Sequence, residues 1–137
     1  MTEPPFRLLP KINEMNRYFW CGGEDGRLHI LRCKSCGTYI HPYAARCPNC
    51  RSADLAPAPV SGRGRVVSFT VNHQQWLPNV PLPYVVAVVE LEEQSNIRLM
   101  TNMPRTPIEK VRHDMPVKVF FERHGDIHLP LFEEANP

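Results

Sequence analysis

The sequence predicts a mainly β protein in which a short N-terminal helix and a small metal-bound ribbon precede a five-stranded barrel. Two Cys-x-x-Cys pairs lie close together in the first half of the chain. The second half holds short apolar runs separated by turn residues, which is typical of β-strands. In addition, fifteen prolines among 137 residues favour turns and extended segments over long helices.

The two cysteine pairs predict a structural metal site, with ten residues between Cys33/Cys36 and Cys47/Cys50. Each pair places two thiolates on one side of a tight turn, and two pairs complete the ligands of a tetrahedral zinc ion. Because four thiolates leave no open coordination position, we expect a structural rather than a catalytic metal. Iron is the alternative, since a four-cysteine site of rubredoxin type binds either metal.

Two other uses of the cysteines are disfavoured. Disulfides conflict with the odd total of five and with first residues that carry no apolar signal segment, so we expect a cytoplasmic protein. Redox chemistry at one Cys-x-x-Cys conflicts with the presence of two matched pairs. Cys21, which lies apart beside two glycines, is interpreted as a small, half-buried thiol.

The N-terminal part predicts an extended arm at residues 1–10, followed by a helix at residues 14–21. Asn13 can cap this helix, and Gly22-Gly23 ends it. The helix carries the densest aromatic cluster of the chain, Tyr18, Phe19 and Trp20. These rings either pack onto the ribbon or form an interface that docks into a partner protein.

The ribbon is predicted from two strands around the first cysteine pair. Residues 27–32 have strand character, residues 38–41 form the return strand, and Pro57 and Pro59 mark residues 52–61 as an extended connector. We therefore divide the chain into an arm and helix at 1–26, a ribbon at 27–56 and a barrel domain at 57–137.

Five strands and one short helix are expected in the last part of the chain. The strands fall at 62–71, 84–91, 97–103, 115–122 and 127–132, and the helix falls at 106–111. This order is that of an OB-fold, a five-stranded barrel. The nearly continuous apolar run at 84–91 suits a central strand that is covered on both faces.

Charge separates two classes of function. The chain carries 16 Lys and Arg against 14 Asp and Glu, which is not the profile of a protein held on a polyanion. Residues 65–137 carry seven basic against nine acidic side chains, whereas a barrel that follows a nucleic-acid backbone should be basic. Binding of single-stranded nucleic acid is therefore kept only as the alternative function. No apolar run approaches the roughly 20 residues of a membrane helix.

The ordered set of motifs resembles the family known as domain of unknown function 35, and the resemblance extends from Phe19 to Phe132. The motifs are Phe19-Trp20, Arg32-Cys33-x-x-Cys36-Gly37, Arg46-Cys47-Pro48-x-Cys50 and Ser61-Gly62-x-Gly64-x-Val66. Members of this family combine a rubredoxin-like zinc ribbon with an OB-fold. The resemblance implies that the four paired cysteines are metal ligands and that the ribbon is structural.

The resemblance also implies a non-catalytic accessory subunit of an acyl-CoA-processing complex, in lipid or aromatic acid degradation. The expected partner is a thiolase-like enzyme or an aldolase that cleaves or forms a C–C bond. A hot-dog-type enoyl-CoA hydratase is a second, less favoured partner. The residues agree with a non-catalytic role, because the chain has no Gly-x-Ser-x-Gly elbow, no phosphate-binding glycine loop and no His-Glu-x-x-His.

Contacts with CoA are expected at the start of the barrel domain. Arg63 and Arg65 flank a glycine where backbone can approach a phosphate, and Phe69, His73 and Trp76 follow as an aromatic surface. The alternative is that the two arginines are ordinary charges that protect a strand edge. Trp76, in a proline-bounded loop, is also a candidate interface residue together with the aromatic cluster of the helix.

Overall fold

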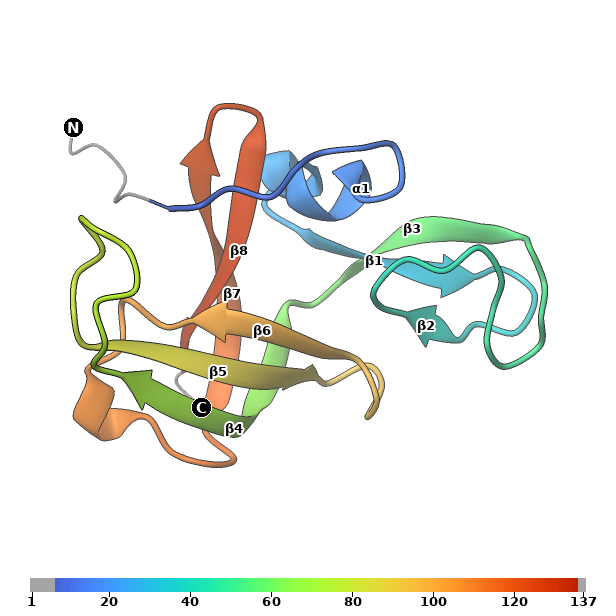
Figure 1. Ribbon diagram of the computed structural model, residues 1–137. Helices are drawn as coiled ribbons and strands as arrows, with labels where there is room; N and C mark the ends of the chain where they lie inside the picture. Colours follow the sequence, from blue (N-terminus) through green and yellow to red (C-terminus); the bar gives the residue numbers. More distant parts are fainter. Residues whose placement is uncertain (1–6, 136–137) are drawn as a thin grey trace.

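The computed structural model describes residues 7–135, which form two β-sheets (Figure 1). The smaller sheet has the strand order β2-β1-β3 and the larger sheet the order β6-β5-β4-β7-β8. The strands are β1 Leu28–Cys33, β2 Tyr39–Ile40, β3 Leu55–Val60, β4 Arg63–Asn72, β5 Tyr84–Leu91, β6 Arg98–Asn102, β7 Pro116–His124 and β8 Ile127–Glu134. None of the helices within residues 7–135 has the length and hydrophobicity that a membrane crossing requires.

The larger sheet confirms the predicted OB-fold. Strands β4, β5 and β6 form an antiparallel meander, and β7 pairs with both β4 and β8. The edge strands β6 and β8 contact each other, which curls the sheet around a buried core. Val66, Val89 and Phe132 lie fully buried in this core. The expectation of a strand covered on both faces was wrong for β5, because side chains on its outer face are only half-buried.

A β-bulge divides β4 into two halves. The register with β5 shifts between Val66 and Ser68, so one extra residue is inserted. Before the bulge Val66 faces the core, and after it Phe69 and Val71 pack against the core. An inserted residue reverses the alternation of faces along a strand. Arg63 and Arg65 therefore lie on the opposite side of the strand from Phe69.

The prediction of an extended connector at residues 52–61 was wrong in part, because this segment contains strand β3. This strand pairs antiparallel with β1 over six positions, from Leu28 opposite Val60 to Cys33 opposite Leu55. Pro57 and Pro59 are tolerated because β3 is an edge strand, where a missing N–H need not break a ladder. The strand also crosses the predicted boundary between residues 56 and 57, and this division of the chain stays a prediction.

Both predicted helices are shorter in the structure. Helix α1 spans Arg17–Trp20, and the 3-10 turn η1 follows at Gly22–Asp25. The side chain of Asn13 accepts hydrogen bonds from the backbone N–H groups of Met15 and Asn16, so it stabilises a turn that precedes α1. The helix expected at 106–111 is reduced to the 3-10 turn η2 at Ile108–Lys110.

Gln94 fastens the ribbon to the barrel. It lies in the turn between β5 and β6, and its Oε1 accepts a hydrogen bond of 2.9 Å from the backbone N–H of Tyr39. Its Nε2 donates to the carbonyl oxygen of Tyr39 at 2.8 Å. The side-chain amide thus forms the pair of hydrogen bonds that a neighbouring strand would form with Tyr39 on β2. The two parts also share a core, because Leu28 and Ile30 belong to the same buried cluster as the barrel residues.

Replacing Gln94 should loosen this attachment. We expect Gln94→Ala to lower the free energy of unfolding by about 1 to 3 kcal/mol, because two hydrogen bonds of about 0.5 to 1.5 kcal/mol each are lost. Urea denaturation of the metal-saturated protein measures the change. Gln74→Ala, in the exposed loop after β4, is the matched control and should have almost no effect. Equal changes in the two variants would contradict the role of Gln94.

Candidate metal centre and apolar cavity

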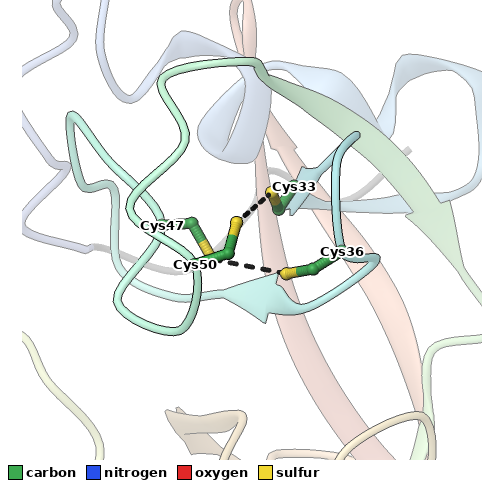
Figure 2. A group of neighbouring side chains, drawn as sticks. All are labelled: Cys33, Cys36, Cys47 and Cys50. Atoms are coloured by element: carbon green, nitrogen blue, oxygen red, sulfur yellow. Dashed lines mark hydrogen bonds between the residues drawn. The ribbon is translucent and has the colours of Figure 1, made fainter.

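The four paired cysteines meet at one end of the ribbon (Figure 2). Their Sγ atoms all lie within 4.8 Å of one another, with 3.5 Å between Cys33 and Cys50 and 3.6 Å between Cys36 and Cys47. A tetrahedral zinc ion with Zn–S bonds of about 2.3 Å places its sulfurs about 3.8 Å apart. The cluster therefore fits a single structural metal ion. Residues 7–135 include all five cysteines and each is a free thiol, so the disulfide alternative was wrong.

Two similar turns bring the sulfurs together. The backbone N–H of Gly37 donates to the carbonyl of Cys33 at 2.9 Å, and Arg51 makes the same bond to Cys47 at 2.8 Å. Both closing residues have a left-handed backbone, with φ of 81° at Gly37 and 66° at Arg51. Glycine adopts this conformation without a steric cost. Arginine does so less readily, so the second turn depends more on its surroundings.

Hydrogen bonds at Cys36 favour its thiolate form. Hydrogen bonding with the Thr38 hydroxyl, and then with the Asn49 side chain, lowers the pKa of Cys36 to about 5. The Sγ–Oγ1 distance to Thr38 is 3.1 Å, and the Asn49 amide donates at 3.6 Å. The backbone N–H of Asn49 also donates to the sulfur of Cys47 at 3.3 Å. At Cys50 a backbone hydrogen bond with Ser52 lowers the pKa, but the Cys33 thiol, burial and the other two thiols of the cluster raise it overall, to about 12. Because a metal binds the thiolate, the donors at Cys36 and Cys47 suit a metal site.

The five residues expected to contact CoA do not share one surface. The guanidinium of Arg65 forms ion pairs with Glu90, at 3.2 Å, and with Asp114. Phe69 faces the core side of β4 and lies 5.2 Å from the ring of His113, on the far side of the strand from Arg63. His73 and Trp76 follow in an exposed loop. Contact of these residues with CoA stays a prediction.

The candidate interface residues differ in exposure. Trp76 is 73% exposed, and its indole N–H donates to the side chain of Asn72 at 3.1 Å. Phe19 is only 6% exposed and packs into the barrel core, where its ring lies 4.8 Å from that of His41. Tyr18 and Trp20 are half-buried. Phe19 is therefore a packing residue, but it packs in the barrel core and not in the ribbon cluster as expected. An interface role for Tyr18, Trp20 and Trp76 stays a prediction.

A large cavity that was not predicted from the sequence lies beside α1. It has a volume of about 1060 Å³ and is bounded by the arm before α1, by β6, by β8 and by the loop that leads into β5. Most of its lining is apolar or aromatic, and it includes Tyr18, Phe19 and Trp20. Its walls come from segments far apart in the chain, so no local pattern in the sequence points to it.

One ion pair holds the arm against the barrel at this cavity. The guanidinium of Arg7 donates to both carboxylate oxygens of Glu122 on β7, at 2.7 and 3.3 Å. A third contact, of 3.5 Å, reaches the side-chain oxygen of Asn102 on β6. The Nε2 atom of His124 lies 2.7 Å from the same carboxylate. Burial alone would raise the pKa of Glu122, but its bonds with Arg7 and His124 lower it overall.

Loss of one paired cysteine should remove the metal. We expect wild-type protein to hold one metal ion per chain and Cys36→Ser to hold far less, because three sulfurs lose much of the binding free energy that folds the ribbon. Elemental analysis after gel filtration measures the content and identifies zinc or iron. Hydrogen exchange of the β1–β2–β3 sheet should become faster in this variant.

Cys21→Ser is the matched control, since Cys21 lies outside the sulfur cluster. It should keep the full metal content and wild-type exchange in the ribbon. Full metal content in Cys36→Ser, or equal loss in both variants, would refute the four-sulfur site.

Comparisons with known proteins agree with this architecture. Residues 20–56 match the family described as ChsH2, rubredoxin-like zinc ribbon domain, and residues 58–122 match the ChsH2, C-terminal OB-fold domain. The solved structure of an Ltp2-ChsH2(DUF35) aldolase superposes with a TM-score of 0.83 and 36% sequence identity. That match covers 93% of this chain and 100% of the other.

The names of two curated relatives refer to a hydratase and a thiolase. The probable enoyl-CoA hydratase alpha subunit of Thermomonospora curvata is 37% identical over 96% of this chain, which spans only 41% of that relative's length. The benzoylsuccinyl-CoA thiolase subunit BbsA of Thauera aromatica is 31% identical over 61% of this chain and 58% of its own length. The lower rank given to a hydratase partner therefore finds no support. Together these matches show that the chain belongs to the DUF35 family, with a ChsH2-type zinc ribbon followed by an OB-fold domain.

Proposed function

We propose that this chain is a non-catalytic accessory subunit of an enzyme complex that processes acyl-CoA thioesters in the cytoplasm. The observation that carries the proposal is the match over 93% of the chain to a chain of the Ltp2-ChsH2(DUF35) aldolase. The catalytic partner is an aldolase, a thiolase-like enzyme or an enoyl-CoA hydratase. All three kinds of enzyme occur in the names of the relatives and of the similar solved structure, which supports this choice of partners.

In this role the metal stabilises the ribbon and supplies no chemistry. The buried cluster of the ribbon is small and consists of Leu31, Cys33, Ile40 and Cys47. So few buried side chains cannot offset the entropy of ordering the long loops around them, and a bound ion supplies the missing free energy. We propose zinc as the ion, with iron as the alternative. Cys33, Cys36, Cys47 and Cys50 would hold it.

The structure gives less support to nucleic-acid binding. Several arginines of the barrel are paired with acidic side chains: Arg65 with Glu90, Arg98 with Glu90, Arg105 with Glu133 and Arg112 with Glu134. A surface that follows a phosphate backbone needs cations that are available to the phosphates. Pairing within the barrel reduces that availability, so the accessory role is favoured.

Affinity capture from the native cells tests the proposed function. We expect the tagged chain to recover one acyl-CoA enzyme in near-stoichiometric amount, as identified by mass spectrometry. The identity of that enzyme decides among hydratase, thiolase and aldolase. Turnover of an acyl-CoA by the isolated chain would refute the non-catalytic role. Recovery of salt-labile nucleic acid without such an enzyme would favour the alternative function.

Trp76 offers a sharper test of the interface. Trp76→Ala should weaken partner binding about tenfold or more, because an exposed tryptophan that becomes buried at an interface often contributes about 2 kcal/mol. Binding of the purified partner by calorimetry measures the change. Gln74→Ala, in the same exposed loop, should bind within about twofold of wild type. If Trp76→Ala binds the partner as tightly as wild type does, Trp76 is an ordinary surface residue and not part of the interface.

A further inference from the structure

The apolar side chains exposed on this protein gather at the cavity beside α1. Within residues 7–135, seven large hydrophobic side chains are exposed, and five of them line this cavity. These five are Leu8, Met15, Tyr43, Leu77 and Met100. Single exposed apolar residues are common on protein surfaces, but a contiguous group around a hollow indicates a binding site.

The wall of the cavity carries almost no charge. Among its described lining residues only Arg7 is a permanent cation, and both of its hydrogen bonds to Glu122 neutralise it. Burial lowers the pKa of His41, which keeps its ring neutral at pH 7. Burial, and then the proximity of Tyr43, raises the pKa of Tyr18, which keeps its phenol neutral. The cavity therefore complements an uncharged ligand and not a phosphate.

The size of the cavity selects a large ligand. Pockets for small molecules usually measure about 300 to 1,000 Å³. A volume of about 1060 Å³ lies just above that range, so an acetyl group would leave most of it empty. The fixed position of the arm also matters. Because Arg7 bonds to β7 and approaches β6, one wall of the cavity is held in place before any ligand arrives.

We propose that this cavity binds the large hydrocarbon part of an acyl-CoA thioester, while the CoA phosphates stay outside it. The inference rests on the proposed function, which supplies the thioester as the class of ligand. The uncharged wall of the cavity does not complement the phosphates of CoA, and its volume is too large for the smallest acyl groups. Its apolar lining complements a long or bulky hydrocarbon group. The rival occupant is an apolar segment of the partner enzyme.

Tryptophan fluorescence can measure binding to the isolated, metal-bound chain. Trp20 lines the cavity and Trp76 does not, so Trp76→Phe leaves one reporter at the site. The probes are octanoyl-CoA, acetyl-CoA and CoA. We expect saturable binding of octanoyl-CoA with an affinity at least tenfold higher than that of acetyl-CoA, because each buried methylene adds favourable transfer free energy. Equal affinities for the three probes would overturn the inference.

Two neighbouring leucines provide matched variants. Leu8 lines the cavity and Leu9 does not, although both are exposed. Leu8→Glu should weaken octanoyl-CoA binding at least tenfold because it places a carboxylate in the apolar wall, whereas Leu9→Glu should stay within about twofold. Met100→Glu, at a side chain that is 75% exposed on β6, should act like Leu8→Glu without unfolding the barrel. Equal losses in Leu8→Glu and Leu9→Glu would overturn the site.

The failure of this inference is distinguishable from failure of the proposed function. Suppose that the isolated chain does not bind octanoyl-CoA and that Leu8→Glu loses its binding to the partner enzyme. The cavity would then be a docking site for a protein segment, and the inference of a hydrocarbon ligand would be wrong. The accessory role would stand in that case. Selective octanoyl-CoA binding without recovery of any acyl-CoA enzyme would support the cavity's ligand and contradict the accessory role.

Discussion

The convergence of four sulfurs at the end of β1 is the constraint on which the other parts of the fold depend. Strand β1 contributes to two cores at once: Leu28 and Ile30 belong to the barrel cluster, while Leu31 and Cys33 belong to the ribbon cluster. An ion bound to Cys33 therefore also fixes the position of β1, whose residues Leu28 and Ile30 pack against the barrel core. The ribbon is small, but it is not an independent appendage.

The same strand connects the sulfur cluster to the cavity. Helix α1 contacts β1, and Tyr18 packs against both the ribbon cluster and the barrel cluster. Phe19 anchors the helix by its burial in the barrel core. Because α1 and the arm before it form one wall of the cavity, the position of that wall depends on the ribbon. Figure 1 shows α1 between the ribbon and strand β8.

Features encoded locally were predictable from the sequence, and features made by distant contacts were not. Cysteine spacing indicated the metal cluster, and apolar periodicity indicated the five barrel strands. Strand β3 was missed because Pro57 and Pro59 usually interrupt strands, and only its edge position makes them acceptable. The bulge after Val66, which separates Arg63 from Phe69, left no clear mark in the sequence. The cavity depends on residues as distant as Leu8 and Pro130, whose proximity only the fold reveals.

A hydrocarbon site on a non-catalytic subunit has a clear physical use under the proposed function. Binding free energy from parts of a substrate remote from the reacting bond can position that bond and discriminate between substrates. The residues that supply it need no catalytic groups, only a shaped and uncharged wall. Such a wall can change with the chain length or ring system of the substrate while the partner's chemistry stays the same. A separate subunit would then set the choice of acyl group independently of the enzyme that reacts with it.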